Sequence, residues 1–437
     1  MDRIERKELS TEFWRFLWSS VLIALSGCLG NVVDGIIVGN LIGQHGVSAI
    51  NLSRPVVQLM FTLSMLTSTG AGMLVGFALG KADHQRARYI FTQALMGSLA
   101  VGLLFTCVGL LLPNQATALL CHDATLFEPT RSYLSVMLIT APAYMLMWAL
   151  STMVGVDGSP RLVSMAILFD NALNLCLDIV FIQLFHWGIA GSSAATAVGH
   201  IAGIAIMLRH FAYSDCRLRL TLRHEQPEWA AIISQGAPLA VASVCLTLLL
   251  FSANSIVLTT AGATGIFVFA VCMNLLQIYN LFLSGTCRTL QSLGAIQVGK
   301  ANDEGFRFVV HRSFSFITTA MVVTCALVWV FPETIARLFG ATDQQVIAEC
   351  NHALRVFALS FIPFCYLYAL MIVYKLFAYH KMALFMSFAL SLTVIPVLWL
   401  FSRYAPNQLW YAYLVAYAIE MGAVAIIHRT AKLQFKI

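Results

Sequence analysis

The sequence predicts an all-α integral membrane protein with twelve transmembrane helices, arranged as two six-helix lobes related by a pseudo-two-fold axis along the membrane normal. Three observations predict this fold class. Hydrophobic residues make up 59% of the chain and charged residues only 11%, whereas a soluble globular chain carries about 25% charged residues. Apolar stretches long enough to cross a bilayer as helices, which takes about 20 residues, recur along the whole chain. The second half of the chain also repeats features of the first.

The apolar stretches are interpreted as helices because they do not alternate in polarity. A transmembrane β-barrel would show segments of about 10 alternating residues, and runs such as 95–112 lack that alternation. In chain order the twelve predicted spans are 13–39, 50–80, 89–112, 131–157, 161–185, 189–211, 229–259, 264–300, 307–331, 349–379, 383–402 and 408–428.

An internal repeat divides the chain in two. Gly80-Lys81-Ala82 and Gly299-Lys300-Ala301 lie 219 residues apart, and each is followed by a charged loop. A repeat of six helices returns the chain to the side where it began, so both halves have the same orientation in the membrane. We therefore predict an N-terminal lobe over 1–211, a cytoplasmic linker over 212–228 and a C-terminal lobe over 229–437.

Basic residues predict the orientation. Most Lys and Arg lie before the first span, after even-numbered spans or at the C-terminus, and the opposite loops offer only Arg131, Arg337 and Arg403. Lys and Arg are retained on the cytoplasmic side, so we expect both termini in the cytoplasm and the chain in the cytoplasmic (inner) membrane. The net charge of +6 then reflects topology and lipid headgroups. A nucleic-acid partner is not expected, because the bases form no stripe with aromatic residues.

The cysteines are expected to pack among hydrophobic residues and not to form a metal or redox site. Eleven Cys are spread mostly through apolar spans with no C-x-x-C pair, which favours small buried hydrophobic residues over a zinc or redox site. Cys121 and Cys350 lie near loops of the outer side. We expect them to be free thiols, with a disulfide between them as the open alternative.

Four polar residues stand inside stretches that otherwise read as membrane-spanning: Asp34, Asn174, Asp178 and Thr196. An Asp at the centre of a bilayer helix costs about 3 kcal/mol, so a function must justify it. Asn174 and Asp178 are four residues apart and share one helix face. Their oxygens, with the threonine hydroxyl, suit a small hard cation such as Na⁺, and a proton is equally compatible. A static hydrogen-bonded network between helices is the remaining alternative.

With these residues in place, the chain resembles the multidrug and toxic compound extrusion (MATE) family of secondary transporters over essentially its whole length. The resembling segments are 33–35 with 38–39, 49–55, 155–161, 174–182 and 188–196. The resemblance implies a twelve-helix, two-lobe fold that exports substrates by antiport against Na⁺ or H⁺. It also implies a cation site in the N-terminal lobe at Asp34, Asn174, Asp178 and Thr196, and all four residue types are retained here.

The chain also departs from the family pattern. Some branches carry acids on the seventh and tenth helices, but here the seventh offers only Asn254 and the tenth has none between Arg355 and Lys375. Coupling through the C-terminal lobe is therefore not expected. Asp170 is an additional acid that the pattern does not require.

Other polar residues are candidates for supporting roles. A relay or supporting shell around the cation site is expected from Asp170, Asn171 and His200. A substrate cleft is expected from Arg54, Gln58, Asn254, Asn274, Gln277 and Arg288, with polar helix packing as the alternative. Glu420 is interpreted either as a group that attracts cationic compounds or as an interfacial acid near a helix end.

The predicted function is secondary active export of organic, cationic amphipathic compounds by a monomer among membrane lipids, without a cofactor and with H⁺ or Na⁺ as the coupling ion. A flippase for lipid-linked oligosaccharides of the same superfamily is the alternative, and it would need a more cationic cleft. A membrane enzyme is disfavoured, since the sequence has no H-E-x-x-H, G-x-S-x-G or Walker motif.

Overall fold

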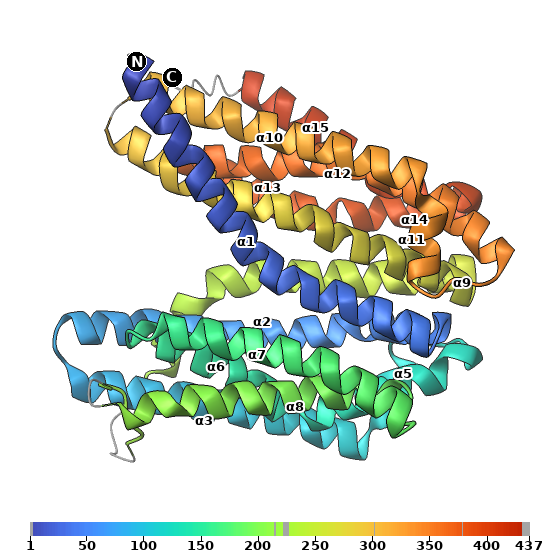
Figure 1. Ribbon diagram of the computed structural model, residues 1–437, viewed down its shortest axis with the longest axis horizontal. Helices are drawn as coiled ribbons and strands as arrows, with labels where there is room; N and C mark the ends of the chain where they lie inside the picture. Colours follow the sequence, from blue (N-terminus) through green and yellow to red (C-terminus); the bar gives the residue numbers. More distant parts are fainter. Residues whose placement is uncertain (1–2, 214–215, 222–226, 301, 378, 431–437) are drawn as a thin grey trace. The chain divides into compact units, whose positions relative to one another are not determined.

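The computed structural model describes residues 3–213, 216–221, 227–300, 302–377 and 379–430, and all regular structure in these ranges is helical (Figure 1). Helices satisfy their backbone hydrogen bonds internally, which a hydrocarbon environment requires. Among the described residues, nine helices are long and apolar enough to cross a membrane, or ten if the bent pair α5 and α6 forms one span.

The helices follow in this order: α1 Arg3–Leu41, α2 Gln44–Gly80, α3 His84–Leu111, α4 Pro113–Ala118, α5 Ala124–Ile139, α6 Ala141–Val156, α7 Pro160–Ile179, η1 Val180–Leu184, α8 Ile189–Leu208, η2 Arg209–Ala212, α9 Trp229–Gly299, α10 Asp303–Val330, α11 Pro332–Leu338, α12 Gln344–Leu376, α13 His380–Leu392, α14 Val394–Tyr404, η3 Pro406–Tyr411 and α15 Ala412–Thr430.

Two breaks relate α9 and the pair α5 and α6 to the predicted spans in those regions. At about 1.5 Å per residue, the 71 residues of α9 are far longer than a bilayer core of about 30 Å. Gly262 interrupts α9 with φ 63° and ψ −157°, a conformation open to glycine, and so separates the predicted spans 229–259 and 264–300. The predicted span 131–157 is instead a bent pair, because α5 and α6 meet at 52° just before Pro142.

The described helices form two compact units, which are treated separately below. One comprises residues 37–255, and the other comprises residues 1–36 with 256–437. The division falls within α1 and within α9, so it does not follow the predicted boundaries of 1–211, 212–228 and 229–437. Those lobe and linker boundaries stay a prediction.

The internal repeat is visible in how helices cross within each unit. In the first unit, a Cβ added at Gly236 of α9 would lie 2.0 Å from the Leu66 carbonyl oxygen of α2. In the second unit, a Cβ added at Gly285 of α9 would lie 2.6 Å from Val21 of α1. Leu66 and Gly285 are 219 residues apart, whereas Gly236 and Val21 are 215 apart, so a close crossing recurs in the two repeats with one side shifted by about one helical turn.

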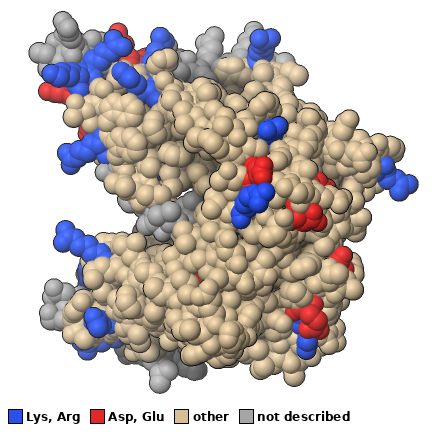
Figure 2. Space-filling model, turned by 45° about the vertical axis from the view of Figure 1, so that its right-hand side comes forward, with Lys and Arg blue, Asp and Glu red and all other residues tan. Residues whose placement is uncertain are grey.

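Charged side chains are sparse on the surface. On the face seen in Figure 2, wide areas carry no Lys, Arg, Asp or Glu. Exposed large hydrophobic residues such as Leu104, Leu111 and Phe77 (66%, 76% and 64% exposed) occupy helix surfaces, as expected for helices that face lipid.

A buried carboxylate anchors the segment that follows α8. Asp157, which ends α6, is 4% exposed. Its Oδ2 lies 2.8 Å from His210 Nε2 and accepts hydrogen bonds from the backbone N–H groups of Arg217 (3.1 Å) and Leu218 (3.2 Å). Further along, Glu228 accepts two hydrogen bonds from Arg86 at 2.9 and 2.7 Å. The described parts of the 212–228 connection are therefore docked on the unit of residues 37–255.

Asp157→Asn should release this connection. An amide cannot provide the charge that strengthens these hydrogen bonds, and bonds to charged groups contribute about 1.5–3 kcal/mol each. We expect tryptic cleavage after Arg217 and Arg219 to become at least about tenfold faster, as followed by mass spectrometry. Asp303→Asn, at an exposed acid in the first turn of α10, is the matched control. Unchanged cleavage of the Asp157 variant would show that the carboxylate does not hold the segment.

Candidate cation-binding site

Small residues on α8 bring it close to α7, and the two helices lie side by side in the unit of residues 37–255 (Figure 1). Gly191, Ala195, Gly199 and Gly203 recur every fourth residue of α8 and are buried. A Cβ added at Gly199 would lie 2.4 Å from Asp170 Oδ1. The glycine spacing therefore creates room for the polar side chains of α7 against the backbone of α8.

Three of the four predicted cation ligands lie along this helix pair. Asn174 Nδ2 donates a hydrogen bond to Thr196 Oγ1 at 3.1 Å, and Thr196 Oγ1 donates to the Ser192 carbonyl at 3.1 Å. Asp178 lies one turn beyond Asn174 and is fully buried. The α-helix ends directly after it, because Val180–Leu184 forms a π-helical turn, a feature often found at functional sites.

A second polar pair lies one turn before Asn174. Asp170 Oδ1 and His200 Nδ1 are 3.1 Å apart, and their side chains are only 9% and 14% exposed. The ring of Tyr144 from α6 lies over the imidazole, with centroids 5.3 Å apart. Asn171, the third predicted supporting residue, is half-buried. We call Asp170, Asn174, Asp178, Thr196 and His200 the α7–α8 wall. It carries one carboxylate a helical turn before the Asn174–Thr196 hydrogen bond and another a turn after it.

Asp34, the fourth predicted ligand, belongs to the unit of residues 1–36 and 256–437. It lies on α1 and is half-buried. The adjacent Gly35 lies against α9, because a Cβ there would be 3.4 Å from the Asn274 side chain and 3.3 Å from Phe339. The two units are described separately, so the joining of Asp34 to the α7–α8 wall stays a prediction.

Some predicted cleft residues make hydrogen bonds between helices, and others are half-buried or exposed. Gln58 Nε2 donates to Ser243 Oγ at 2.9 Å, and Asn254 exchanges hydrogen bonds with Asn51 at 2.8 and 2.9 Å. These amides pack α2 against the first half of α9, which is the alternative that the sequence left open. Asn274 is buried and donates to the Ala270 carbonyl at 3.0 Å. The remaining members are the half-buried Arg54 and Gln277 and the exposed Arg288.

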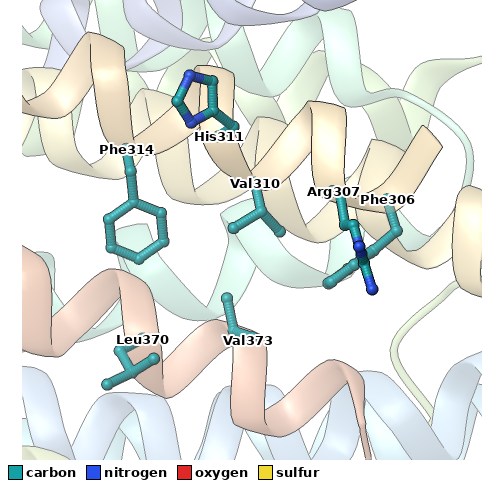
Figure 3. Close-up of a pocket in the computed structure, with 7 residues that line it drawn as sticks. All are labelled: Phe306, Arg307, Val310, His311, Phe314, Leu370 and Val373. Atoms are coloured by element: carbon teal, nitrogen blue, oxygen red, sulfur yellow. The ribbon is translucent and has the colours of Figure 1, made fainter. Parts of the chain in front are cut away.

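A groove of about 360 Å³ lies between α10 and α12, away from all of these residues. Val310 and Phe314 point toward Leu370 and Val373 across it, and Arg307 and His311 lie near its edge (Figure 3). None of the predicted site residues lines this groove.

Sequence reasoning missed one cluster and misplaced one acid. The side-chain ligand atoms of Asp157, His210 and Cys216 lie within 4.8 Å of one another, and burial raises the pKa of the Cys216 thiol. Asp157 Oδ2 already lies near three N–H donors, and Arg217 Nε is 3.5 Å from Oδ1, so the geometry favours an anchor over a metal site. The interfacial interpretation of Glu420 is wrong, because that residue is only 2% exposed on the core-facing side of α15.

Gly199→Ala tests the α7–α8 wall directly. The new methyl group would overlap Asp170 Oδ1 and must displace the Asp170–His200 pair, so we expect a loss of about 1–3 kcal/mol of stability together with impaired function. Gly76→Ala is the control, since its Cβ would meet only Val156 Cγ1 at 3.9 Å. Thermal unfolding of the two purified variants measures the difference. Equal midpoints would contradict the packing described here.

The chain is similar to known proteins over most of its length. A family model described as MatE matches residues 20–180 and again 238–400, one match in each predicted lobe. The multidrug export protein MepA of Staphylococcus aureus (strain NCTC 8325 / PS 47) is 25% identical over 337 residues, which cover 76% of this chain and 74% of MepA. MepA of Staphylococcus haemolyticus (strain JCSC1435) is 23% identical over 338 residues, again 76% and 74% of the two chains.

Solved structures show the same fold. An inward-facing multidrug resistance MATE family transporter of the MOP superfamily matches with a TM-score of 0.83 and 18% identity, over 93% of this chain and 96% of that one. The MATE multidrug transporter DinF-BH matches with a TM-score of 0.73 and 20% identity, over 95% of each chain. The predicted fold class, an all-α multi-pass membrane protein of this architecture, is confirmed. Because the family model covers most of both halves, the chain belongs to the MatE family.

Proposed function

We propose that this chain is a secondary active exporter of organic compounds, driven by an inward gradient of H⁺ or Na⁺. Membership of the MatE family supports this proposal, as do relatives that are named multidrug export proteins. No cofactor is needed, because ion binding biases the equilibrium between outward-facing and inward-facing states through its differential affinity for them.

The coupling cation would bind at Asp34, Asn174, Asp178 and Thr196. The observation that carries this assignment is the Asn174–Thr196 hydrogen bond beside the fully buried Asp178, within two otherwise apolar helices. Carboxylate, amide and hydroxyl oxygens can replace the hydration shell of Na⁺, or the carboxylates can take up a proton.

The Asp170–His200 pair favours protons. Its atoms lie 3.1 Å apart in a nearly buried position, and imidazole is the side chain whose charge changes in the physiological pH range. A proton that reaches the α7–α8 wall could pass between this pair and the neighbouring carboxylate. Na⁺ gains nothing from an imidazole, because it binds oxygen ligands.

The proposed substrates are cationic amphipathic compounds. The chain carries 17 Met and 29 Phe, and such side chains can adapt to varied ligands. Arg54 and Arg288 are the bases among the predicted cleft residues, which gives little support to the alternative of a flippase for lipid-linked oligosaccharides. We also propose that the chain acts as a monomer in the cytoplasmic membrane, with both termini cytoplasmic according to the positive-inside rule.

Asp34→Asn and Asp178→Asn should each abolish gradient-driven efflux. The amide keeps the size of the side chain but cannot exchange a proton and supplies no charge for a cation. Reconstituted vesicles loaded with a fluorescent organic cation, under an imposed pH gradient and then an imposed Na⁺ gradient, measure efflux and identify the ion. Asp303→Asn serves as the control at an exposed acid. Normal efflux by both site variants, at normal expression, would refute the proposed site.

His200→Gln should flatten the pH dependence of substrate binding. Glutamine can still hydrogen-bond to Asp170 but cannot take up a proton, so protons should compete less with a cationic substrate. We expect wild-type affinity for a cationic dye to fall as the pH is lowered, and the variant to show a smaller fall. Dye fluorescence titrations at several pH values measure this. An identical pH profile in the variant would remove His200 from the coupling path.

A further inference from the structure

Glu420 occupies a core position near the middle of α15. The buried residues Tyr413, Ala416, Tyr417 and Val424 of this helix recur at helical spacing, and Glu420 falls on the same stripe. It is 2% exposed. An acid therefore stands where the pattern of the helix provides an apolar side chain.

The carboxyl group has no polar partner in the part of the chain that the structure describes. Neither Oε1 nor Oε2 has a hydrogen-bond partner, and Glu420 takes part in no ion pair among the described residues. A buried carboxyl group without partners is unusual, since most buried polar side chains are satisfied.

The middle stretches of the described helices around Glu420 contain no basic residue that could act as a counter-charge. α15 packs against α12, α13, α14 and η3, with Tyr417 5.2 Å from Phe364 of α12 between ring centroids. The stretches 356–374 of α12 and 382–392 of α13 contain no charged residue and no His. Arg403, at the end of α14, is exposed. Besides Glu420, the titratable groups in these stretches, in η3 and on α15 up to residue 428 are Cys365, Tyr366, Tyr368, Tyr374, Tyr411, Tyr413, Tyr417 and His428, and α9 contributes Cys272 beside Tyr413. The ends of these helices add Glu349, Cys350, His352, Arg355, Lys375, His380, Lys381, Tyr404 and Arg429.

These surroundings determine the state of the acid. An ionised carboxylate without a counter-charge or hydrogen bond is strongly disfavoured in an apolar interior, and such a group is neutralised instead. A purely structural role is a poor explanation, because an apolar residue of similar volume would pack there without this penalty. Ionisable residues inside membrane helices more often belong to an ion or proton pathway.

We propose that Glu420 is a proton-binding site of the unit formed by residues 1–36 and 256–437, loaded with a proton in this conformation. The proton is released from the carboxyl oxygen when a conformational change admits water or a cationic substrate to the group, and it is taken up again when the group is reburied. No other bond changes. This proposal rests on the proposed proton-coupled export and adds a second proton site, in a part of the chain where the sequence predicted no coupling.

Infrared difference spectroscopy tests the bound proton without any need for transport. The purified wild-type protein should show the C=O stretching band of a buried protonated carboxylic acid, and Glu420→Gln should lack that band. Glu333→Gln, at an exposed acid that pairs with Arg337, should retain it. An identical spectrum for wild type and Glu420→Gln would overturn the proposal, because the carboxyl group would then be ionised. Glu420→Leu should raise the unfolding temperature, and a fall would reveal a stabilising polar role.

Transport measurements then test whether this proton is used. Glu420→Gln should lower the number of protons exchanged per exported cation and reduce the pH dependence of efflux, whereas Asp178→Asn should abolish efflux. Wild-type proton stoichiometry in Glu420→Gln would overturn the coupling role. Absence of gradient-driven efflux in the wild type would instead contradict the proposed function, and the infrared result would still decide whether Glu420 holds a proton.

Discussion

Polar groups inside apolar helices are stable only when they find partners within the protein or lose their charge. Where α7 meets α8, glycine or alanine at every fourth position from Gly191 to Gly203 lets the helices approach closely, so that Asn174 reaches Thr196 and Asp170 reaches His200. The same close packing leaves Asp178 fully buried. The small residues of α8 thus make room for the α7–α8 wall. The partners available there allow acids to occur in helices that are otherwise apolar.

A related principle distinguishes the polar residues that stabilise from those that can do chemistry. Asn51 and Asn254 hydrogen-bond to each other between α2 and α9, and Asp157 accepts hydrogen bonds from the backbone of the following connection. Such hydrogen bonds to the backbone and between helices fix segments in place. Asp170 is different because its partner His200 lies beside the predicted cation ligands, and Glu420 is different because its carboxyl group has no hydrogen-bond partner among the described residues.

Much of the fold was predictable from the sequence, since hydropathy determines where membrane helices occur. The repeat at 219 residues indicated two halves of the same orientation, and a close crossing of helices does occur within each unit. The break at Gly262 falls between two predicted spans. The bend just before Pro142 falls within a predicted span, and helix periodicity does not reveal such a bend. Of the candidate site, the shared face of Asn174 and Asp178 followed from their spacing. The burial of Glu420 and the anchoring by Asp157 did not, because both depend on which distant helices pack together.

The central claim is that carboxylates of the α7–α8 wall hold a proton that competes with a cationic substrate. Proton release on substrate binding tests it most directly, by adding an organic cation to the purified protein in weakly buffered solution and following pH with an indicator dye. The account predicts release in the wild type and a clear reduction in Asp178→Asn. Saturable binding without any proton release from the wild type would contradict it.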